Sequence, residues 1–293
     1  MCITKLDGKY FSHPAKWRDT IDPYTLNYHL FQLKEILGYP HAGNDVFHVK
    51  GILGGEEITA YIKAERQTGA AVENEAAIIR QINDLAVPRI LDADFGDQPF
   101  IVSRELPGMR LSVIVGENKD LLSLEYMEEY GEMLGRIHSL TISANSVADR
   151  KFFHVPSREI LEKLDLAYLN EYFENIPPAG KTVFCHGDFH YANLLWEDHH
   201  ISGILDFELA GYGDRDFDIA WAILLRPGQK FLKTREEQKQ FFKGYAKYGE
   251  YNWKNIQFYM AQCYVYFLSF SGSDEKYCSY VKAWLRDHCN KIQ

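Results

Sequence analysis

One 25-residue stretch constrains this chain more than any other: Phe184–Glu208, which reads FCHGDFHYANLLWEDHHISGILDFE and holds four histidines and five carboxylates. Two kinds of site use residues of these types. A magnesium–nucleotide site would use the Asp and Asn residues, because magnesium prefers oxygen ligands. A transition-metal centre would rest on imidazole nitrogens, supplied here by His186, His190, His199 and His200.

The first hundred residues have the pattern of a small antiparallel sheet. Asp45–Leu53 and Ile58–Ala64 are rich in β-branched and aromatic residues, and Gly54-Gly55 between them indicates a hairpin. Val72–Leu85 has apolar residues at helical spacing and is followed by Pro88. The remaining elements that we predict here are a helix over Tyr24–Leu37 and strands over Arg89–Ala93 and Phe100–Arg104.

After Pro107-Gly108 the pattern becomes helical. One exception is a hairpin predicted from Asn193–Trp196 and Ile201–Phe207, followed by a helix that starts near Asp216 or Asp218. The fold expected is α+β, with a β-rich N-terminal lobe over residues 1–106 and a mainly helical C-terminal lobe over residues 107–293. Its other predicted helices are Leu124–Leu140, Arg158–Phe173, Trp253–Phe270 and Asp274–Lys291.

Composition excludes several classes of protein. The net charge of −9 argues against a nucleic-acid partner, which would require a basic face. No apolar run approaches the roughly 18–20 residues needed to cross a bilayer, so we expect no membrane span. The five cysteines include no CxxC pair, which disfavours a disulfide framework or a zinc knot and favours a cytoplasmic location.

Asp188, Asn193 and Asp206 stand in an order that suits phosphoryl transfer. This reaction needs a carboxylate to orient or deprotonate the attacking hydroxyl, and oxygen ligands for magnesium on the nucleotide phosphates. The protein-kinase signature H-R-D-x-x-x-x-N followed by D-F-G has the same order and the same Asp-to-Asn interval. The pattern therefore favours the magnesium–nucleotide site.

The longer stretch HGDFHYANLLWEDHHISGILDFELAGYGDRDFDIAW resembles the active-site signature of the aminoglycoside phosphotransferase (choline-kinase-like) family of small-molecule kinases. The resemblance implies a bilobal protein-kinase-like fold and transfer of the γ-phosphoryl group of ATP or GTP, with Mg²⁺, to a hydroxyl of a small molecule. It also implies a role for each matched residue. Asp188 would be the catalytic base, His186 a brace of the loop, Asn193 and Asp206 the magnesium ligands, and Asp218 the support of the loop amides.

The first lobe carries an independent sign of the same fold. A kinase-like site needs a strand lysine that pairs with the α/β-phosphates and a helix glutamate that holds this lysine. Lys63 lies in the apolar strand AYIKA, and Glu75 lies twelve residues further on, with Glu73 as its nearest competitor. We therefore expect Lys63 in both catalysis and nucleotide binding, and Glu75 as its partner.

The phosphate loop and the hinge are less distinctive. There is no G-x-G-x-x-G motif, and the segment His41–Asp45 lies where a shorter phosphate loop would be expected. Gly43 and Asn44 are its candidate phosphate contacts, although a plain turn would explain them as well. Ile101–Gly108 resembles the hinge between lobes, with Arg104 and Leu106 as candidate contacts to the purine.

Three alternatives are weaker. A metal hydrolase would need His186 and His190 on one helix face, but Gly187 predicts a loop there. A nucleotide-binding pseudokinase is disfavoured because every expected catalytic position is filled. A protein kinase is disfavoured because Glu208 replaces the D-F-G glycine and the chain leaves no room for an activation loop before Asp218.

The acceptor is the least determined part of the prediction. An aminoglycoside or another hydroxylated amine is the leading candidate. Antibiotic resistance would then be the expected biological role. Kinases of choline, homoserine, sugars or macrolides are the alternatives within the family. Aromatic and acidic side chains would suit an amine, although aromatic residues at helical spacing more often belong to a core. The candidates are Tyr259, Tyr264, Tyr266, Phe267, Asp274 and Glu275.

Overall fold

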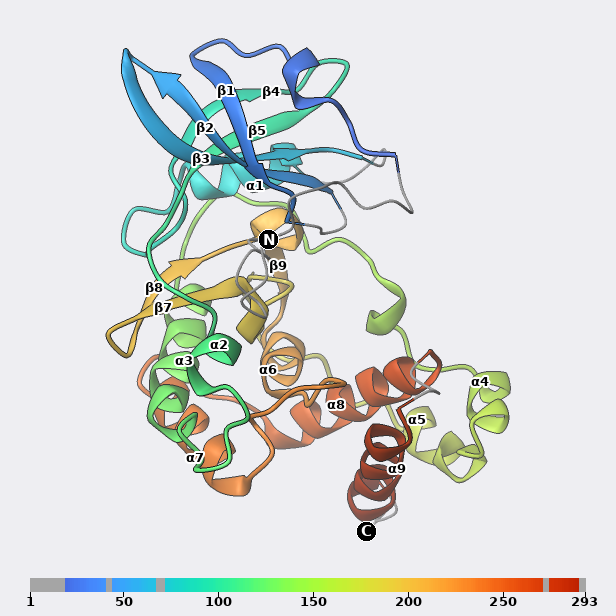
Figure 1. Ribbon diagram of the computed structural model, residues 1–293. Helices are drawn as coiled ribbons and strands as arrows, with labels where there is room; N and C mark the ends of the chain where they lie inside the picture. Colours follow the sequence, from blue (N-terminus) through green and yellow to red (C-terminus); the bar gives the residue numbers. More distant parts are fainter. Residues whose placement is uncertain (1–18, 41–43, 67–71, 271–273, 290–293) are drawn as a thin grey trace. The chain divides into compact units, whose positions relative to one another are not determined.

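A computed structural model describes residues 19–40, 44–66, 72–270 and 274–289 (Figure 1). The chain divides into two compact units. The first unit combines Met1–Glu117, Thr141–Ala144 and Tyr191–Ala210, and the second combines Asn118–Leu140, Asn145–His190 and Gly211–Gln293. Within the described residues, no helix has the length and apolar character needed to cross a membrane.

The first unit is built around a five-stranded antiparallel sheet with the strand order β1-β2-β3-β5-β4. Its alternating apolar residues form one buried layer that includes Phe47, Ile62 and Val102. The strands are β1 (Phe31–Gly38), β2 (Asp45–Leu53), β3 (Glu56–Ala64), β4 (Ile90–Asp94) and β5 (Phe100–Arg104).

The helix predicted over Tyr24–Leu37 is wrong. This segment forms a short 3₁₀ turn, η1 (Pro23–Thr25), and then enters strand β1. The cause is a residue that is distant in the sequence. One carboxylate oxygen of Asp92 accepts the amides of three consecutive residues, His29, Leu30 and Phe31, at 2.8–2.9 Å. These bonds hold the backbone extended where the local pattern favours a helix.

Helix α1 (Val72–Ile79) follows β3 and is shorter than the predicted Val72–Leu85. It packs through Val72 and Ala76 against Ile101 of β5. The predicted hairpin is present as β7 (Leu194–Glu197) and β8 (His200–Ile204), and it belongs to the first unit. The first unit also contains the short helix α2 (Leu111–Val115) and the 3₁₀ turns η4 (Tyr191–Asn193) and η5 (Phe207–Leu209).

The second unit is mainly helical, with a two-stranded sheet of β6 (Thr182–Cys185) and β9 (Gly211–Asp214). The single helix predicted over Arg158–Phe173 is instead two, because Asp165 adopts a positive φ of 58° between them. An α+β chain with a β-rich N-terminal part and a mainly helical C-terminal part is thus confirmed. The helices are α3 (Leu124–His138), α4 (Arg158–Lys163), α5 (Asn170–Glu174), α6 (Arg215–Ile223), α7 (Arg235–Tyr245), α8 (Trp253–Leu268) and α9 (Glu275–Cys289).

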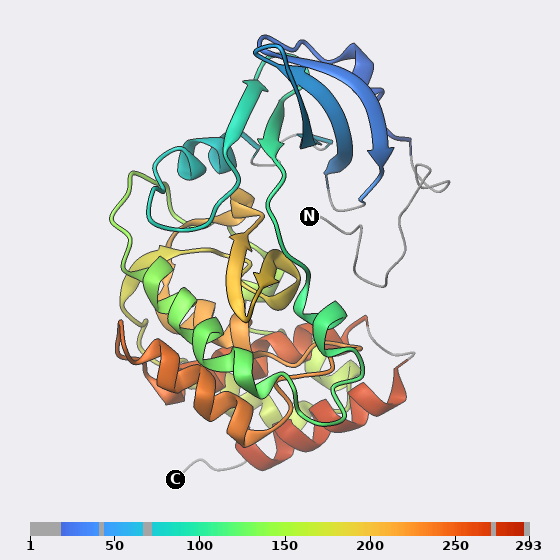
Figure 2. The same ribbon diagram turned by 60° about the vertical axis from the view of Figure 1, so that its left-hand side comes forward.

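Helices α3 and α7 run side by side in the second unit (Figure 2). Glycines stand where their backbones meet. A Cβ atom on Gly131 would lie 1.9 Å from the carbonyl oxygen of Phe241, and one on Gly244 would lie 1.8 Å from that of Glu128. Both distances are far below van der Waals contact, so the approach of the two helices depends on the absence of side chains at these positions.

Candidate functional site

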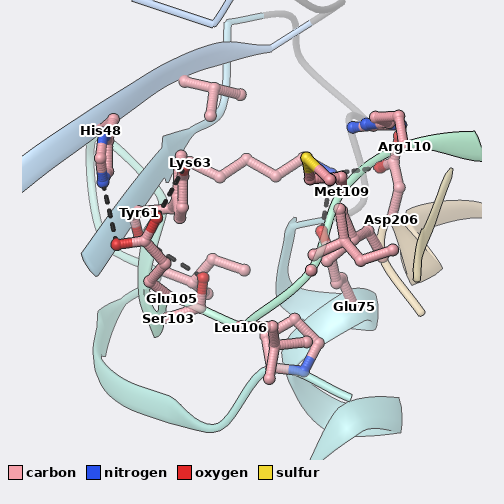
Figure 3. A pocket seen from close by; sticks show the side chains of 16 residues that line it. His48, Tyr61, Lys63, Glu75, Ser103, Glu105, Leu106, Met109, Arg110 and Asp206 are labelled. Carbon is pink, nitrogen blue, oxygen red and sulfur yellow. Dashed lines mark hydrogen bonds and ion pairs between the residues drawn. The ribbon is translucent and has the colours of Figure 1, made fainter. Parts of the chain in front are cut away.

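The first unit contains a cavity of about 160 Å³ that opens around Lys63 (Figure 3). The sheet supplies one wall through side chains of β2, β3 and β5. The segment that follows β5 supplies another, and the hairpin contributes Leu195 and Leu205. Apolar walls with a few convergent polar groups are typical of a small-ligand site. The polar groups include His48, Tyr61, Lys63, Glu75, Glu105 and Asp206.

Lys63 is the centre of an ion-pair cluster in this cavity. Its ammonium donates to Glu75 Oε2 at 2.7 Å and to Asp206 Oδ1 at 2.6 Å, and it lies 2.9 Å from Glu208 Oε2. The lysine is only 8% exposed, whereas Glu73, the competitor of Glu75, is exposed. The strand and the helix therefore bring together the lysine and the glutamate that the sequence singles out.

The cluster carries more negative than positive charge. One oxygen atom from each of Glu75, Asp206 and Glu208 lies within 4.8 Å of the other two, and all three carboxylates contact a single ammonium. Burial opposes the charge of Lys63, but the three carboxylates outweigh it and raise its pKa well above the usual range. Burial also raises the pKa of Glu75. The charge of Lys63 opposes this rise in pKa, whereas the charges of Asp206 and Glu208 add to it. A divalent cation would relieve this excess of negative charge.

A backbone hydrogen bond connects the segments that carry the two candidate magnesium ligands. The amide of Leu205, the residue before Asp206, donates to the carbonyl oxygen of Asn193 at 2.8 Å. Asn193 is 1% exposed. Asp206 has φ 70° and ψ 59°, a left-handed conformation that is uncommon for residues other than glycine. An amide oxygen and carboxylates are the donor set that magnesium prefers, so these residues fit the ion.

The phosphate-loop candidates are only partly described. Gly43 lies outside the described residues. Asn44 is buried, and its amide nitrogen donates to Glu208 Oε2 at 2.7 Å while its oxygen accepts the amide of Arg66 at 3.3 Å. The side chain of Asn44 thus connects the start of β2 with the carboxylate that replaces the D-F-G glycine.

The hinge candidates differ in their exposure. Leu106 lines the cavity, whereas the side chain of Arg104 is exposed and its amide bonds to Arg89 within the sheet. Between them, Glu105 Oε2 lies 3.1 Å from His48 Nε2, and the ring of His48 stacks on that of Tyr61 at 4.6 Å. No local motif in the sequence marks these three side chains, so they could not be predicted from it.

The loop His186–Asp188 belongs to the second unit and is anchored by Asp218. The carboxylate of Asp218 accepts the amides of His186 at 3.1 Å and Gly187 at 3.2 Å. His138, at the end of α3, places its Nε2 3.1 Å from the same carboxylate. The amide of Asp188 donates to His186 Nδ1 at 3.3 Å, which requires this nitrogen to be unprotonated. The backbone of the loop is therefore held on both sides.

The side chain of Asp188 is oriented by a residue that sequence reasoning missed. Trp221 Nε1 donates to Asp188 Oδ1 at 2.8 Å. His190 Nε2 lies 3.4 Å from the same oxygen. A signal was present in the sequence, because Asp218 and Trp221 are three residues apart on a predicted helix and therefore share a face.

The histidines do not gather into one ligand set. His199 and His200 lie exposed at the hairpin tip, and His186 is buried in the loop His186–Asp188. In the part of the chain that the structure describes, the clusters able to hold a metal are that of Glu75, Asp206 and Glu208 and that of His138, Cys185 and Asp218. In the second cluster Asp218 and His138 bind each other, and Asp218 also accepts two amides of the loop. The three carboxylates of the first cluster share a single ammonium and keep an excess of negative charge, so this cluster is the better candidate for an ion.

The chain is similar in sequence to known phosphotransferases. A model of the phosphotransferase enzyme family (APH) matches residues 42–259. An aminoglycoside 3'-phosphotransferase of Niallia circulans is 28% identical over an alignment of 207 positions, and the match covers 64% of this chain and 75% of that protein.

Solved structures show the same fold at low identity. The apo form of a thermostable mutant of the aminoglycoside phosphotransferase APH(4)-Ia matches with a TM-score of 0.60 and 14% identity, over 88% of this chain and 96% of that one. A complex of an amicoumacin kinase with AMP-PNP and Ca²⁺ matches with a TM-score of 0.55 and 13% identity, over 90% and 91% of the two chains. Because the family model spans well over half of the sequence, we conclude that this protein belongs to the APH phosphotransferase family of small-molecule kinases.

Proposed function

We propose that the protein transfers the γ-phosphoryl group of ATP or GTP, with Mg²⁺, to a hydroxyl group of a small molecule. The observation that carries the proposal is the buried ion pair of Lys63 Nζ with Glu75 Oε2, at 2.7 Å. Both residues line the cavity, together with Asp206. In kinases a lysine held in this way contacts the nucleotide phosphates. The amicoumacin kinase that shares the fold was solved with AMP-PNP and Ca²⁺, which supports a nucleotide and a divalent cation here.

The residues of the chain divide the chemistry between them. Lys63 would hold the α/β-phosphates, and Asn193 and Asp206 would hold the magnesium ion, whose charge offsets that of the phosphates when it is bound. Asp188 would accept the proton of the acceptor hydroxyl as the new oxygen–phosphorus bond forms. The bond between the γ-phosphorus and the bridging oxygen breaks, and its electron pair leaves with the nucleoside diphosphate.

For the acceptor, we propose a hydroxylated amine of the aminoglycoside type as the first candidate. The curated relative from Niallia circulans is an aminoglycoside 3'-phosphotransferase. Tyr266 and Phe267 are partly exposed near the aromatic group around Trp221 and offer ring faces to a cation. Tyr264 is instead core, because it is 1% exposed and its hydroxyl accepts the amide of Leu225.

A nucleotide-consumption screen tests the proposal. The protein is mixed with Mg²⁺ and either ATP or GTP, and then with aminoglycosides, macrolides, choline, homoserine or sugars. We expect nucleoside diphosphate release that depends on one acceptor class and a phosphomonoester product by mass spectrometry. Absence of nucleotide binding and of any turnover, with water included as an acceptor, would overturn the kinase assignment.

A further inference from the structure

Trp221 is held rigidly on α6 of the second unit. The ring of Phe152 stacks on its indole, with ring centroids 4.4 Å apart and planes inclined by 12°. The guanidinium carbon of Arg226 lies 4.7 Å from the indole centroid. Both neighbours are themselves fixed: Arg226 donates to the carbonyl oxygens of Trp221 and Leu224 at 2.7 and 3.1 Å, and the buried Gln262 donates to that of Phe152 at 2.7 Å.

The clamped ring directs its one polar atom at Asp188. An indole nitrogen can only donate, so its partner at 2.8 Å, Asp188 Oδ1, must be an acceptor. A hydrogen bond to a charged acceptor is stronger than one between neutral groups and favours the ionised carboxylate. The guanidinium beside the ring adds a positive charge close to this bond, which strengthens the N–H as a donor.

We propose that Trp221 is a positioning residue for phosphoryl transfer: its clamped indole fixes the rotation of the Asp188 carboxylate and keeps that carboxylate ionised, with Arg226 reinforcing the effect. The inference rests on the proposed function, in which Asp188 is the base. Other described groups that face Asp188 include His190, 3.4 Å from Oδ1, and His186, which accepts its amide; Asp218 on α6 faces the amides before it.

The experiment separates this role from that of an ordinary core tryptophan. Trp221 is replaced by 3-benzothienylalanine, which keeps the ring shape but exchanges N–H for sulfur, and separately by phenylalanine. Arg226→Met tests the contribution of the guanidinium. Trp284→Phe is the matched control, because Trp284 also stacks, on His288 at 4.4 Å, but belongs to α9. Each protein is labelled with ¹³C at aspartate, and the Asp188 carboxyl resonance is followed against pH.

We expect both Trp221 replacements to raise the pKa of Asp188 by about one unit, the equivalent of one hydrogen bond to a charged group. Arg226→Met should shift it in the same direction by less, and Trp284→Phe should leave it unchanged. An Asp188 pKa that is the same in the benzothienylalanine protein and the wild type would overturn the positioning role.

Measurements of turnover distinguish a failure of the positioning role of Trp221 from a failure of the proposed kinase function. Mg²⁺-dependent release of nucleoside diphosphate is measured with ATP or GTP and with each acceptor of the nucleotide-consumption screen, water included. We expect the Trp221 replacements to lower kcat roughly tenfold while the KM for ATP stays the same. Wild-type protein that binds no nucleotide and turns over none of these acceptors would refute the kinase assignment even if the resonance of Asp188 still responds to Trp221. An unchanged kcat in both replacements would refute the positioning role alone.

Discussion

Asp218 and Trp221 stand three residues apart on one face of α6 and hold the same loop in different ways. The carboxylate of Asp218 accepts two backbone amides of the loop, while the indole of Trp221 donates to the side chain of Asp188. One helix thereby sets both the path of the loop and the direction of its carboxylate. Asp214 caps the N-terminus of this helix, because its side chain accepts the amides of Asp216 and Phe217.

Replacing the proposed base should separate chemistry from binding. In Asp188→Asn the side chain keeps its shape and an oxygen that can accept the Trp221 N–H, but it can no longer take a proton. We expect kcat to fall by roughly 10²–10⁴-fold, the usual contribution of a general base, with nucleotide affinity nearly unchanged. Isothermal titration with a non-hydrolysable nucleotide and initial-rate kinetics measure the two quantities. Turnover close to that of the wild type would remove Asp188 from the mechanism.

The excess of carboxylates around Lys63 predicts opposite effects with and without magnesium. In Glu208→Gln one of three acidic groups becomes neutral, so repulsion with Asp206 and Glu75 decreases. We expect the metal-free variant to melt at a higher temperature than the wild type, and its gain in Tm on adding Mg²⁺ and nucleotide to be smaller. Thermal unfolding with EDTA and then with millimolar magnesium measures both. A lower Tm of the metal-free variant would show that Glu208 stabilises Lys63 more than it repels its neighbours.

The hydrogen bonds to Glu237 predict that the folded protein loses stability in acid. Burial of this carboxylate is outweighed by hydrogen bonds from Ser123, Leu232 and Thr234, which hold its pKa below the usual 4.5. Its contribution is therefore complete above the unfolded pKa and disappears as the pH falls through the folded one. Glu237→Gln should lower the free energy of unfolding by roughly 1.5–3 kcal/mol near neutral pH. Urea titrations at several pH values should show this difference shrinking below about pH 4.5; a constant difference would contradict the assignment.

The contact between α3 and α7 predicts a steric effect. Gly131→Ala would place a methyl group against the Phe241 carbonyl at 1.9 Å, so the helices must separate. We expect a loss of about 1–3 kcal/mol or more in the free energy of unfolding. Gly249→Ala is the control, since its Cβ would meet Tyr245 atoms only at 3.4 Å and beyond. Equal stabilities of the two variants in chemical denaturation would mean that the helices can move apart without cost.

The parts of the fold that the sequence predicted are those with local signals. The hairpins have turn residues between β-rich runs, and the Lys63-to-Glu75 interval spans one strand and the start of one helix, so both could be placed in advance. Strand β1 could not, because its extended entry depends on the distant carboxylate of Asp92.

The candidate site follows the same division. The motif around Asp188 names residue types in order, but it does not say which side chains lie against them. The bond from Trp221, the stack of His48 on Tyr61 and the contact of Glu208 with Lys63 all join residues through tertiary packing. The sequence does place Trp221 on the same helix face as Asp218, but it does not show that the indole contacts Asp188, and the other two pairs have no sequence spacing that marks them.

The glycines between α3 and α7 have a consequence for how this enzyme can vary. Helix α3 ends at His138, which binds the Asp218 carboxylate that holds the loop His186–Asp188, so the separation of the two helices governs where that imidazole lies. Random mutagenesis scored by activity should therefore return Gly131 and Gly244 alongside the reactive residues, although neither has a side chain. As the sequence diverges during evolution, these two positions should stay glycine, because any side chain there would clash with the backbone of the neighbouring helix.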